Sequence, residues 1–244
     1  MARAEGSTVT TRKGRRGTRR RRPLRLVVRW LVRGVLVSVV MVLALVALFG
    51  RVDPPPGIYM LQERARLGAI TRDWVPMEAI SPHMARSAVA AEDANFCLHW
   101  GFDMAEIRRA LDAGGRRGAS TISQQVVKNV FLWHGRSWPR KAAEALLTPV
   151  LEATWSKRRI LEVYLNVAEF DAGVFGVEAA ARHYFGTSAA QLTAQQSARL
   201  AAILPDPQGR DAARPSTFVQ RRAAAIMDGA ATIARDGRAA CFEG

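Results

Sequence analysis

Two glutamates in the sequence, Glu92 and Glu144, are the residues best suited to acid–base chemistry. Glu92 ends an apolar helical pattern and is followed at short spacing by Asp93 and His99. A carboxylate at the edge of an apolar helix can be partly desolvated, which raises its pKa and makes it a usable general base. An ordinary solvated helix end would carry similar residues, so this segment alone leaves both interpretations open.

A second polar segment, residues 118–129, has the composition of a site for phosphate and sugar groups. Ser120 is expected to cap a helix, with Gly118 supplying the turn before it. Ser120, Gln124 and Lys128 would then share one helix face near a helix N-terminus, where backbone N–H groups attract anions. The alternative is a polar solvated stripe, although such a stripe would more often carry Glu and Lys than Ser, Thr and paired Gln.

A third segment, residues 136–144, places Glu144 among cationic residues. Pro139 suits the first turn of a helix, and Arg140 and Glu144 lie four residues apart and share a face. This arrangement is either one more surface ion pair, which would be worth little, or a second functional carboxylate beside a cationic site.

Helices are the elements that must position these residues. Apolar residues recur at spacings of three and four beyond residue 57, and no good run of alternating strand pattern occurs. We therefore predict a mostly α-helical domain, in which the segments 157–166 and 176–186 serve mainly core packing. The expected helices cover residues 82–94, 103–112, 120–132, 138–154, 157–167, 174–184, 193–204 and 216–235.

The N-terminal part of the chain predicts a membrane anchor. Residues 1–33 contain 12 basic residues and one acidic residue, a net charge of +11 out of the total of +15. Residues 34–50 contain no charged side chain, and a run of this length is at the short end of what spans a bilayer. A cleaved signal peptide is the alternative, although the apolar run is long for one. Basic residues before the span predict that the N-terminus stays in the cytoplasm and the rest of the chain lies outside it.

The remaining segments follow from composition. Residues 51–59 are expected to be a Pro-rich spacer, because three consecutive prolines exclude regular helix. Residues 60–235 form the expected globular domain, and residues 236–244 a C-terminal tail that has no clear pattern. Cys97 and Cys241 lie far apart in the sequence and are expected to be unpaired, and no Cys/His pattern indicates a metal site.

Taken together and in this order, the polar segments resemble the peptidoglycan glycosyltransferase family, which includes the glycosyltransferase domain of bifunctional penicillin-binding proteins. Four family patterns stand intact: E-D-x-x-F-x-x-H-x-G, G-x-S-T-I-x-Q-Q-x-x-K-N, R-K-x-x-E and K-x-x-I-L-E-x-Y-L-N. The similarity extends from about residue 60 to about residue 235, and it is closest to the monofunctional biosynthetic members of Gram-negative bacteria. No Ser-x-x-Lys or Lys-Thr-Gly pattern occurs, so no penicillin-sensitive transpeptidase site is expected.

The resemblance implies a lysozyme-like, mostly α fold with a large lobe and a smaller membrane-associated jaw, which looks short here between Asp103 and Gly118. It implies an inverting, moenomycin-sensitive enzyme that polymerises lipid II into β-1,4-linked glycan strands and releases undecaprenyl diphosphate. Glu92 would be the catalytic base and Glu144 the second catalytic carboxylate. The implied substrate-binding residues are Ser120, Gln124, Gln125, Lys128, Asn129, Arg136 and Arg140.

The resemblance also implies partners and a location. Lipid II and the growing glycan strand would be the substrates, and no nucleic acid is expected. The chain would be a single-pass protein of the inner (cytoplasmic) membrane with a periplasmic catalytic domain, in contact with membrane lipids and with cell-division or elongation proteins. The sequence requires no cofactor and shows no metal cage, although a divalent cation, Mg²⁺ or Mn²⁺, could assist the diphosphate.

Three other functions fit parts of the sequence. A lysozyme-class hydrolase also uses a carboxylate pair on a helical fold, but it has no use for the cations around Glu144. A non-catalytic membrane scaffold would not require both Glu92 and Glu144. A nucleic-acid binder rests only on the charge of residues 1–33.

Overall fold

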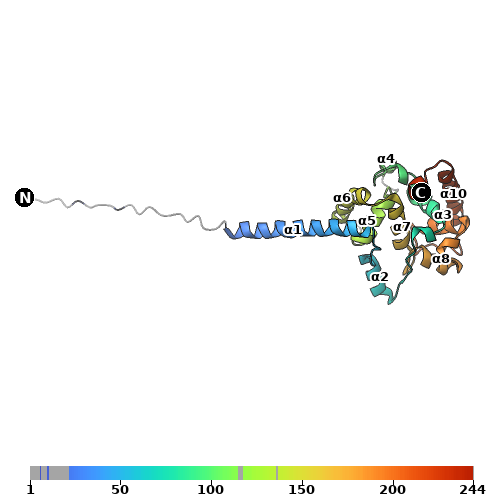
Figure 1. Cartoon of the computed structure of the whole chain (residues 1–244), viewed down its shortest axis with the longest axis horizontal. Coiled ribbons are helices and arrows are strands. Elements are labelled where there is room, and N and C mark those ends of the chain that lie inside the picture. Colours follow the sequence, from blue (N-terminus) through green and yellow to red (C-terminus); the bar gives the residue numbers. More distant parts are fainter. Residues whose placement is uncertain (1–5, 7–9, 11–21, 115–117, 136, 244) are drawn as a thin grey trace, which may run out of the picture. The chain divides into compact units, whose positions relative to one another are not determined.

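Helices make up most of the described chain, as the sequence predicts (Figure 1). A computed structural model describes residues 22–114, 118–135 and 137–243, together with Gly6 and Thr10. The chain divides into two compact units between Leu43 and Ala44. The second unit holds all the site residues described below.

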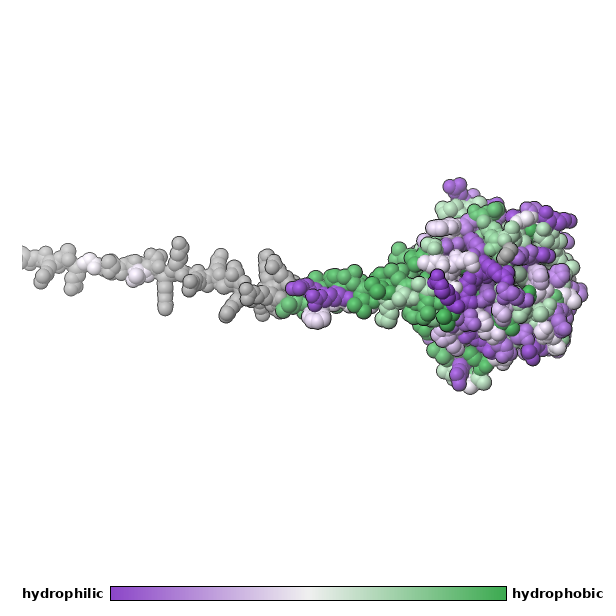
Figure 2. Space-filling view, viewed as in Figure 1, coloured by the Kyte–Doolittle hydropathy of each residue, from purple (hydrophilic) through white to green (hydrophobic). Residues whose placement is uncertain are grey.

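Helix α1 (Arg22–Phe49) is the one helix among the described residues that is long and apolar enough to cross a membrane. Its candidate span, Leu26–Phe49, has a mean hydropathy of 2.7 and is almost entirely exposed. The span begins before the uncharged run 34–50 and therefore includes Arg29 and Arg33. Figure 2 shows that the surface of α1 is largely hydrophobic, whereas the visible face of the domain is mixed. These features fit a single-pass membrane anchor.

Each segment predicted to be helical contains a helix. These helices are α3 (Pro82–Glu92), α4 (Met104–Asp112), α5 (Ile122–Phe131), α6 (Trp138–Thr154), α7 (Lys157–Val167), α8 (Val177–Phe185), α9 (Ala194–Ile203) and α10 (Thr217–Arg235). Two further helices, α2 (Ile58–Leu67) and α11 (Ala240–Glu243), lie outside the predicted segments, and α11 is only one turn long. Single 3₁₀ turns are η1 (Met77–Ala79), η2 (Phe96–Leu98) and η3 (Ala189–Gln191).

The core is built from two groups of helices. Helices α3, α9 and α10 pack on one another, and α5 packs against α6 and α7. Helix α7 is buried along most of its length, which confirms that its segment is mainly core. Its polar Asn166 is structural as well, because the side-chain amide exchanges two hydrogen bonds of 2.9 Å with the backbone of Val75. In α8 the small residues Ala179, Ala180 and Ala181 are buried, as expected for close packing.

A small sheet accompanies the helices of the mostly α-helical domain. Its three strands are β1 (Thr71–Arg72), β2 (Glu169–Asp171) and β3 (Val174–Phe175). They pair in the order β1-β3-β2, with β1 parallel and β2 antiparallel to β3. Strands of two or three residues are too short to show an alternating pattern, so the sequence did not reveal them.

The expectation that both cysteines are unpaired is wrong. Cys97 and Cys241 form a disulfide, and their Cα atoms lie 5.7 Å apart. Cys97 belongs to η2 and Cys241 to α11, two elements that pack against each other. Pairing depends on the distance between two Cα atoms in the fold, which a sequence separation of 144 residues does not reveal. The C-terminal tail is therefore an integral part of the domain.

Candidate active site

Glu92 is the last residue of α3 and lines a cavity of about 510 Å³. Apolar residues of α3, including Met84, Ala88 and Val89, are buried in the core, and the helix ends where Glu92 reaches the cavity. The loop after α3, the segment before α5 and Arg222 of α10 form the other walls. The fold thus places a carboxylate between packed helices and an open space large enough for a sugar unit.

The Glu92 carboxylate is half-buried and is held by Gln125, whose Nε2 donates to Glu92 Oε2 at 2.9 Å. Burial raises the pKa of Glu92, and the negative charge of Asp93 adds to the rise. The hydrogen bond from Gln125 and the positive charges of Arg222 and Lys128 act in the opposite direction. A carboxyl group with a raised pKa that faces a cavity is suited to general-base catalysis.

Asp93 joins the end of α3 to the start of α5. Its Oδ2 accepts a 3.0 Å hydrogen bond from the backbone N–H of Ile122, and its Oδ1 lies 2.7 Å from His99 Nε2. The His99 carbonyl accepts a 2.8 Å hydrogen bond from Lys157 Nζ. Asp93 and His99, both in the first sequence pattern, therefore hold the loop that follows Glu92.

Helix α5 begins with a capping box at Thr121, which corrects the expectation that Ser120 is the cap. The Thr121 hydroxyl accepts from the Gln124 backbone N–H, and the Gln124 side-chain oxygen accepts from the Thr121 backbone N–H. Gln124 is consequently buried, and it lines neither the large cavity nor the smaller cavity beyond Gln125. The predicted contact between Gln124 and substrate therefore has no support in the structure, whereas Gln125 reaches Glu92.

Glu144 lies on α6 in a cationic cluster, as the sequence suggests. Arg140 Nη1 donates to Glu144 Oε2 at 2.7 Å, and both side chains are buried. Lys141 Nζ donates to the other carboxylate oxygen of Glu144 and, at 3.2 Å, to Ser120 Oγ. Sequence reasoning did not select Lys141, although it is the lysine of the R-K-x-x-E pattern. Because cations hold both oxygens of Glu144, this carboxylate orients the cations.

Lys128 and Asn129 line the smaller cavity, of about 200 Å³, and Gln125 borders both cavities. Burial lowers the pKa of Lys128, while the carboxylates of Glu144 and Glu92 act in the opposite direction. Among the described residues, none forms a hydrogen bond or ion pair with Lys128 Nζ. A half-buried ammonium without a protein partner can bind an anionic ligand.

Tyr59 and His134 also line the smaller cavity, and no sequence pattern indicated them. Their rings stack with centroids 3.7 Å apart, and the Tyr59 hydroxyl donates to Glu169 Oε2 at 2.7 Å. Tyr59 comes from α2, His134 from the loop after α5 and Glu169 from β2. Only the folded chain brings these three residues together.

A family model agrees with this site. The model described as Transglycosylase matches residues 61–231, which include Glu92, Glu144 and both cavities except for Tyr59. The chain belongs to the transglycosylase family. The family expected from the four sequence patterns is thereby confirmed.

Curated relatives of this transglycosylase named "Biosynthetic peptidoglycan transglycosylase" match over most of their length. The Jannaschia sp. (strain CCS1) protein is 64% identical over 214 residues, 88% of this chain and 90% of that protein. The Rhodospirillum centenum protein is 50% identical over 214 residues, covering 85% and 93%. The Caulobacter vibrioides protein is 45% identical over 223 residues, covering 88% and 97%. Family and relatives together confirm the predicted peptidoglycan glycosyltransferase activity.

The predicted site residues of this transglycosylase fall into three groups. One group lines the two cavities or the cationic cluster: Glu92, Ser120, Gln125, Lys128, Asn129, Arg140 and Glu144. Gln124 belongs to the helix cap. Arg136 lies outside the described residues. The described chain contains no group of three or more His, Cys, Asp or Glu side chains that could hold a metal ion.

Proposed function

We infer that this transglycosylase polymerises lipid II into β-1,4-linked glycan strands in bacterial cell-wall synthesis and releases undecaprenyl diphosphate. Such a transfer requires a base for the attacking hydroxyl and cations for the leaving diphosphate. The position of Gln125 is the observation on which the proposal rests. Its side chain borders both cavities and holds Glu92, which lines the larger one, so an acceptor and a donor in neighbouring cavities could meet beside this base.

We propose Glu92 as the general base of this reaction. Its carboxylate would take the proton from the 4-hydroxyl of the acceptor N-acetylglucosamine as that oxygen attacks the anomeric carbon of the growing strand. Attack opposite the leaving group inverts the anomeric carbon and gives the β-1,4 bond. The raised pKa of Glu92 supports the role, because a more basic carboxylate accepts a proton more readily.

The cations of α5 and α6 would stabilise the leaving diphosphate. Negative charge grows on the phosphate oxygens as the bond to the anomeric carbon breaks, and preorganised cations lower the barrier. Lys128 has no described partner of its own, and Arg140 and Lys141 are oriented by Glu144. Glu144 would therefore contribute by positioning these cations, with Ser120 and Asn129 contacting the substrate nearby.

The ion pairs of Glu144 with Arg140 and Lys141 argue against a lysozyme-class hydrolase. Such enzymes use two carboxyl groups that flank the scissile bond, one as acid and the other as nucleophile or base. Here both oxygens of Glu144 are bound to Arg140 and Lys141. A second free carboxylate is therefore not available at this position, whereas a diphosphate would benefit from the cations.

A divalent cation, Mg²⁺ or Mn²⁺, remains part of the proposal as an aid to the diphosphate. The described residues offer no cluster of metal ligands, and Glu144 already pairs with two cations. We therefore expect that such an ion would be bound chiefly by diphosphate oxygens, where it would neutralise their charge.

We propose that the chain is a single-pass protein of the inner membrane, with its N-terminus in the cytoplasm and its catalytic domain in the periplasm. The basic residues before α1 support this orientation. The disulfide supports it independently, because disulfides persist in the periplasm and are rare in the cytosol. Membrane lipids and lipid II would then surround the anchor, and cell-division or elongation proteins are the expected protein partners.

Polymerisation of lipid II by Glu92→Gln in detergent tests the assignment. An amide cannot accept the proton, so the rate should fall by roughly 10²- to 10⁴-fold. The variant should remain folded. Burial raises the pKa of Glu92, so the folded state loses stability as the pH rises through this pKa and the carboxyl group ionises. Glutamine does not ionise and therefore avoids this loss at neutral pH. Thermal unfolding would establish folding, and full polymerisation by the folded variant would refute the role of Glu92.

A further inference from the structure

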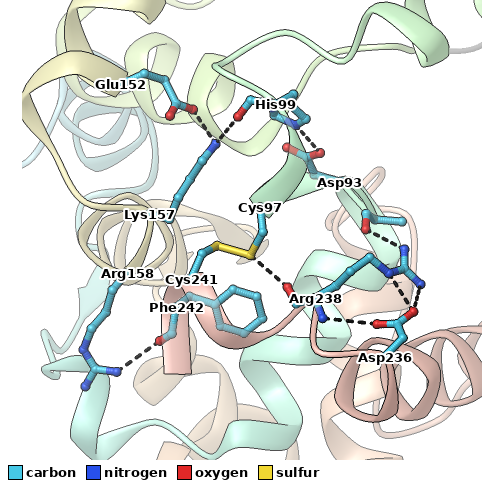
Figure 3. The surroundings of a disulfide bond; sticks show 11 residues. Asp93, Cys97, His99, Glu152, Lys157, Arg158, Asp236, Arg238, Cys241 and Phe242 are labelled. Carbon is cyan, nitrogen blue, oxygen red and sulfur yellow. Dashed lines mark hydrogen bonds and ion pairs between the residues drawn. A yellow bond between two sulfur atoms is a disulfide. The ribbon is translucent and has the colours of Figure 1, made fainter. Parts of the chain in front are cut away.

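The C-terminal segment 236–243 lies behind the loop that forms one wall of the large cavity. Ala94 and Asn95 of this loop line the cavity beside Glu92 and Asp93. Figure 3 shows the C-terminal segment against the loop, joined to it by the disulfide. The loop that forms this wall is thus supported from behind by residues far away in the sequence.

Three contacts join the segment to the loop. Cys241 is bonded to Cys97, three residues after Ala94. Arg238 Nη1 donates a 3.0 Å hydrogen bond to the Ala94 carbonyl. Phe242 and Phe96 are fully buried, with ring centroids 6.4 Å apart. A covalent bond, a charge-assisted hydrogen bond and an aromatic contact therefore all act on the same short loop.

The C-terminal segment also forms hydrogen bonds with helices α3 and α7 of the domain. Arg86 of α3 forms two hydrogen bonds with Glu243, of 2.6 and 2.9 Å. Arg158 of α7 donates to the Phe242 carbonyl at 3.1 Å. Because α3 is the helix that ends in Glu92, the segment bridges the body of this helix and the loop that follows it.

The front of the same loop faces the substrate cavity and is held by polar contacts. Asn95 Nδ2 donates to Asp103 Oδ2 at 2.8 Å, and Asp93 accepts from the backbone of Ile122. Apart from the single turn η2, the loop has no regular structure of its own. Its position therefore depends on both sets of contacts, and only the rear set includes a covalent bond.

We propose that Cys97, Cys241 and Arg238 are positioning residues for glycosyl transfer, which hold the loop after Glu92 in the geometry the reaction requires. Reduction by a dithiol converts the disulfide to two thiols while the dithiol becomes a disulfide. The loop then loses its covalent support, and the turnover rate falls in a protein that is still folded. The proposal rests on the proposed role of Glu92.

The test uses the full chain in detergent and measures kcat and KM for lipid II below the unfolding temperature. Oxidised wild type is compared with wild type that has been reduced and alkylated, and with the double variant Cys97→Ser/Cys241→Ser. We expect both altered forms to lose kcat on the order of tenfold, with KM nearly unchanged. The chain has no other cysteine, so the same reagents should leave the double variant unaffected.

A second variant leaves the disulfide in place. Arg238→Met removes the hydrogen bond to Ala94 and should also lower kcat, and Arg238→Lys should restore part of it. Arg235→Met is the matched control, since Arg235 is exposed at the end of α10 and should keep wild-type kcat.

Two outcomes separate the hypotheses. A reduced, folded enzyme with wild-type kcat and KM, together with a fully active Arg238→Met, would overturn the positioning role even if the melting temperature fell. An active Glu92→Gln, assayed in parallel, would instead refute the base assignment.

Discussion

The surroundings of Glu92 act on its pKa in opposite directions. Burial and Asp93 favour its neutral form, while Gln125, Arg222 and Lys128 favour its ionised form. A base acts only when ionised, so activity is expected above its pKa and is lost as the pH falls through it. Burial is the strongest of these influences, which places the acid limb of the pH–rate profile above the ordinary pKa of a glutamate.

Removing the hydrogen bond from Gln125 should move this acid limb. In Gln125→Leu the carboxylate loses a donor that stabilises its charge, so its pKa rises and the limb shifts to higher pH. The measurement is kcat/KM for lipid II as a function of pH. Gln195→Leu, on the exposed face of α9, is the control and should keep the wild-type profile. An unshifted acid limb in Gln125→Leu would show that another group governs it.

Lys141 is the cation that links Ser120 to Glu144. Lys141→Met removes a positive charge from the proposed diphosphate site and should lower kcat on the order of a hundredfold. Lys141→Arg keeps the charge and should retain most of the activity. Steady-state kinetics with lipid II would decide, and wild-type turnover by the methionine variant would exclude Lys141 from the reaction.

At the scale of elements, the start of α5 determines which side chains face the cavities. Its capping box fixes the first turn, and the Thr121 hydroxyl also donates to the Gly101 carbonyl at 2.7 Å. In the same turn, the backbone N–H of Ile122 donates a hydrogen bond to Asp93. The cap therefore both stabilises α5 and helps to position the loop that follows Glu92.

Thr121→Ala should lower both stability and activity. Loss of the cap costs about 1 kcal/mol of unfolding free energy, and the loop at Gly101 loses its tether. Thr193 begins α9 with the same kind of capping box and lines neither cavity. Thr193→Ala should therefore lose a comparable stability with unchanged kcat. Denaturant unfolding and lipid II kinetics measure the two effects, and equal activity of both variants would contradict the proposed coupling.

At the scale of the whole molecule, the site belongs to a unit that begins at Ala44, after most of the membrane helix. Within this unit, Trp155 Nε1 donates to the Val46 carbonyl at 2.7 Å, and Arg159 donates to the carbonyls of Phe49 and Val52. The last residues of α1, which belong to this unit, are thus hydrogen-bonded to the rest of the domain.

Removal of residues 1–43 should leave a folded enzyme that works poorly at a membrane. The rest of the chain forms its own compact unit, so thermal unfolding should be little changed. Polymerisation of lipid II in vesicles should fall, because the anchor concentrates enzyme and substrate on one surface. An unrelated single-pass helix in place of residues 1–43 should restore the rate. Undiminished activity on vesicles without any anchor would contradict this role.

The sequence by itself determined the helical domain and its family, and it indicated the apolar helix α1 and the residues proposed for the site. Apolar periodicity arises from the helix repeat, so it marked α3 through α10 wherever a helix buries one face. The ordered patterns selected Glu92, Glu144, Lys128 and Arg140, because chemistry restricts which residue types can occur at such spacings. All these signals are local in the chain, which is why they could be read without a fold.

The tertiary structure decided which way individual helix side chains face and which segments far apart in the sequence come into contact. One residue along a helix turns a side chain by roughly 100°. Of the two neighbouring glutamines expected to bind substrate, Gln124 therefore lies in the helix cap while Gln125 reaches Glu92. The stacking of Tyr59 on His134 and the bond between Cys97 and Cys241 join segments that meet only in the fold. No local pattern records such contacts, because they are set by how the helices pack and not by the residues beside them in the chain.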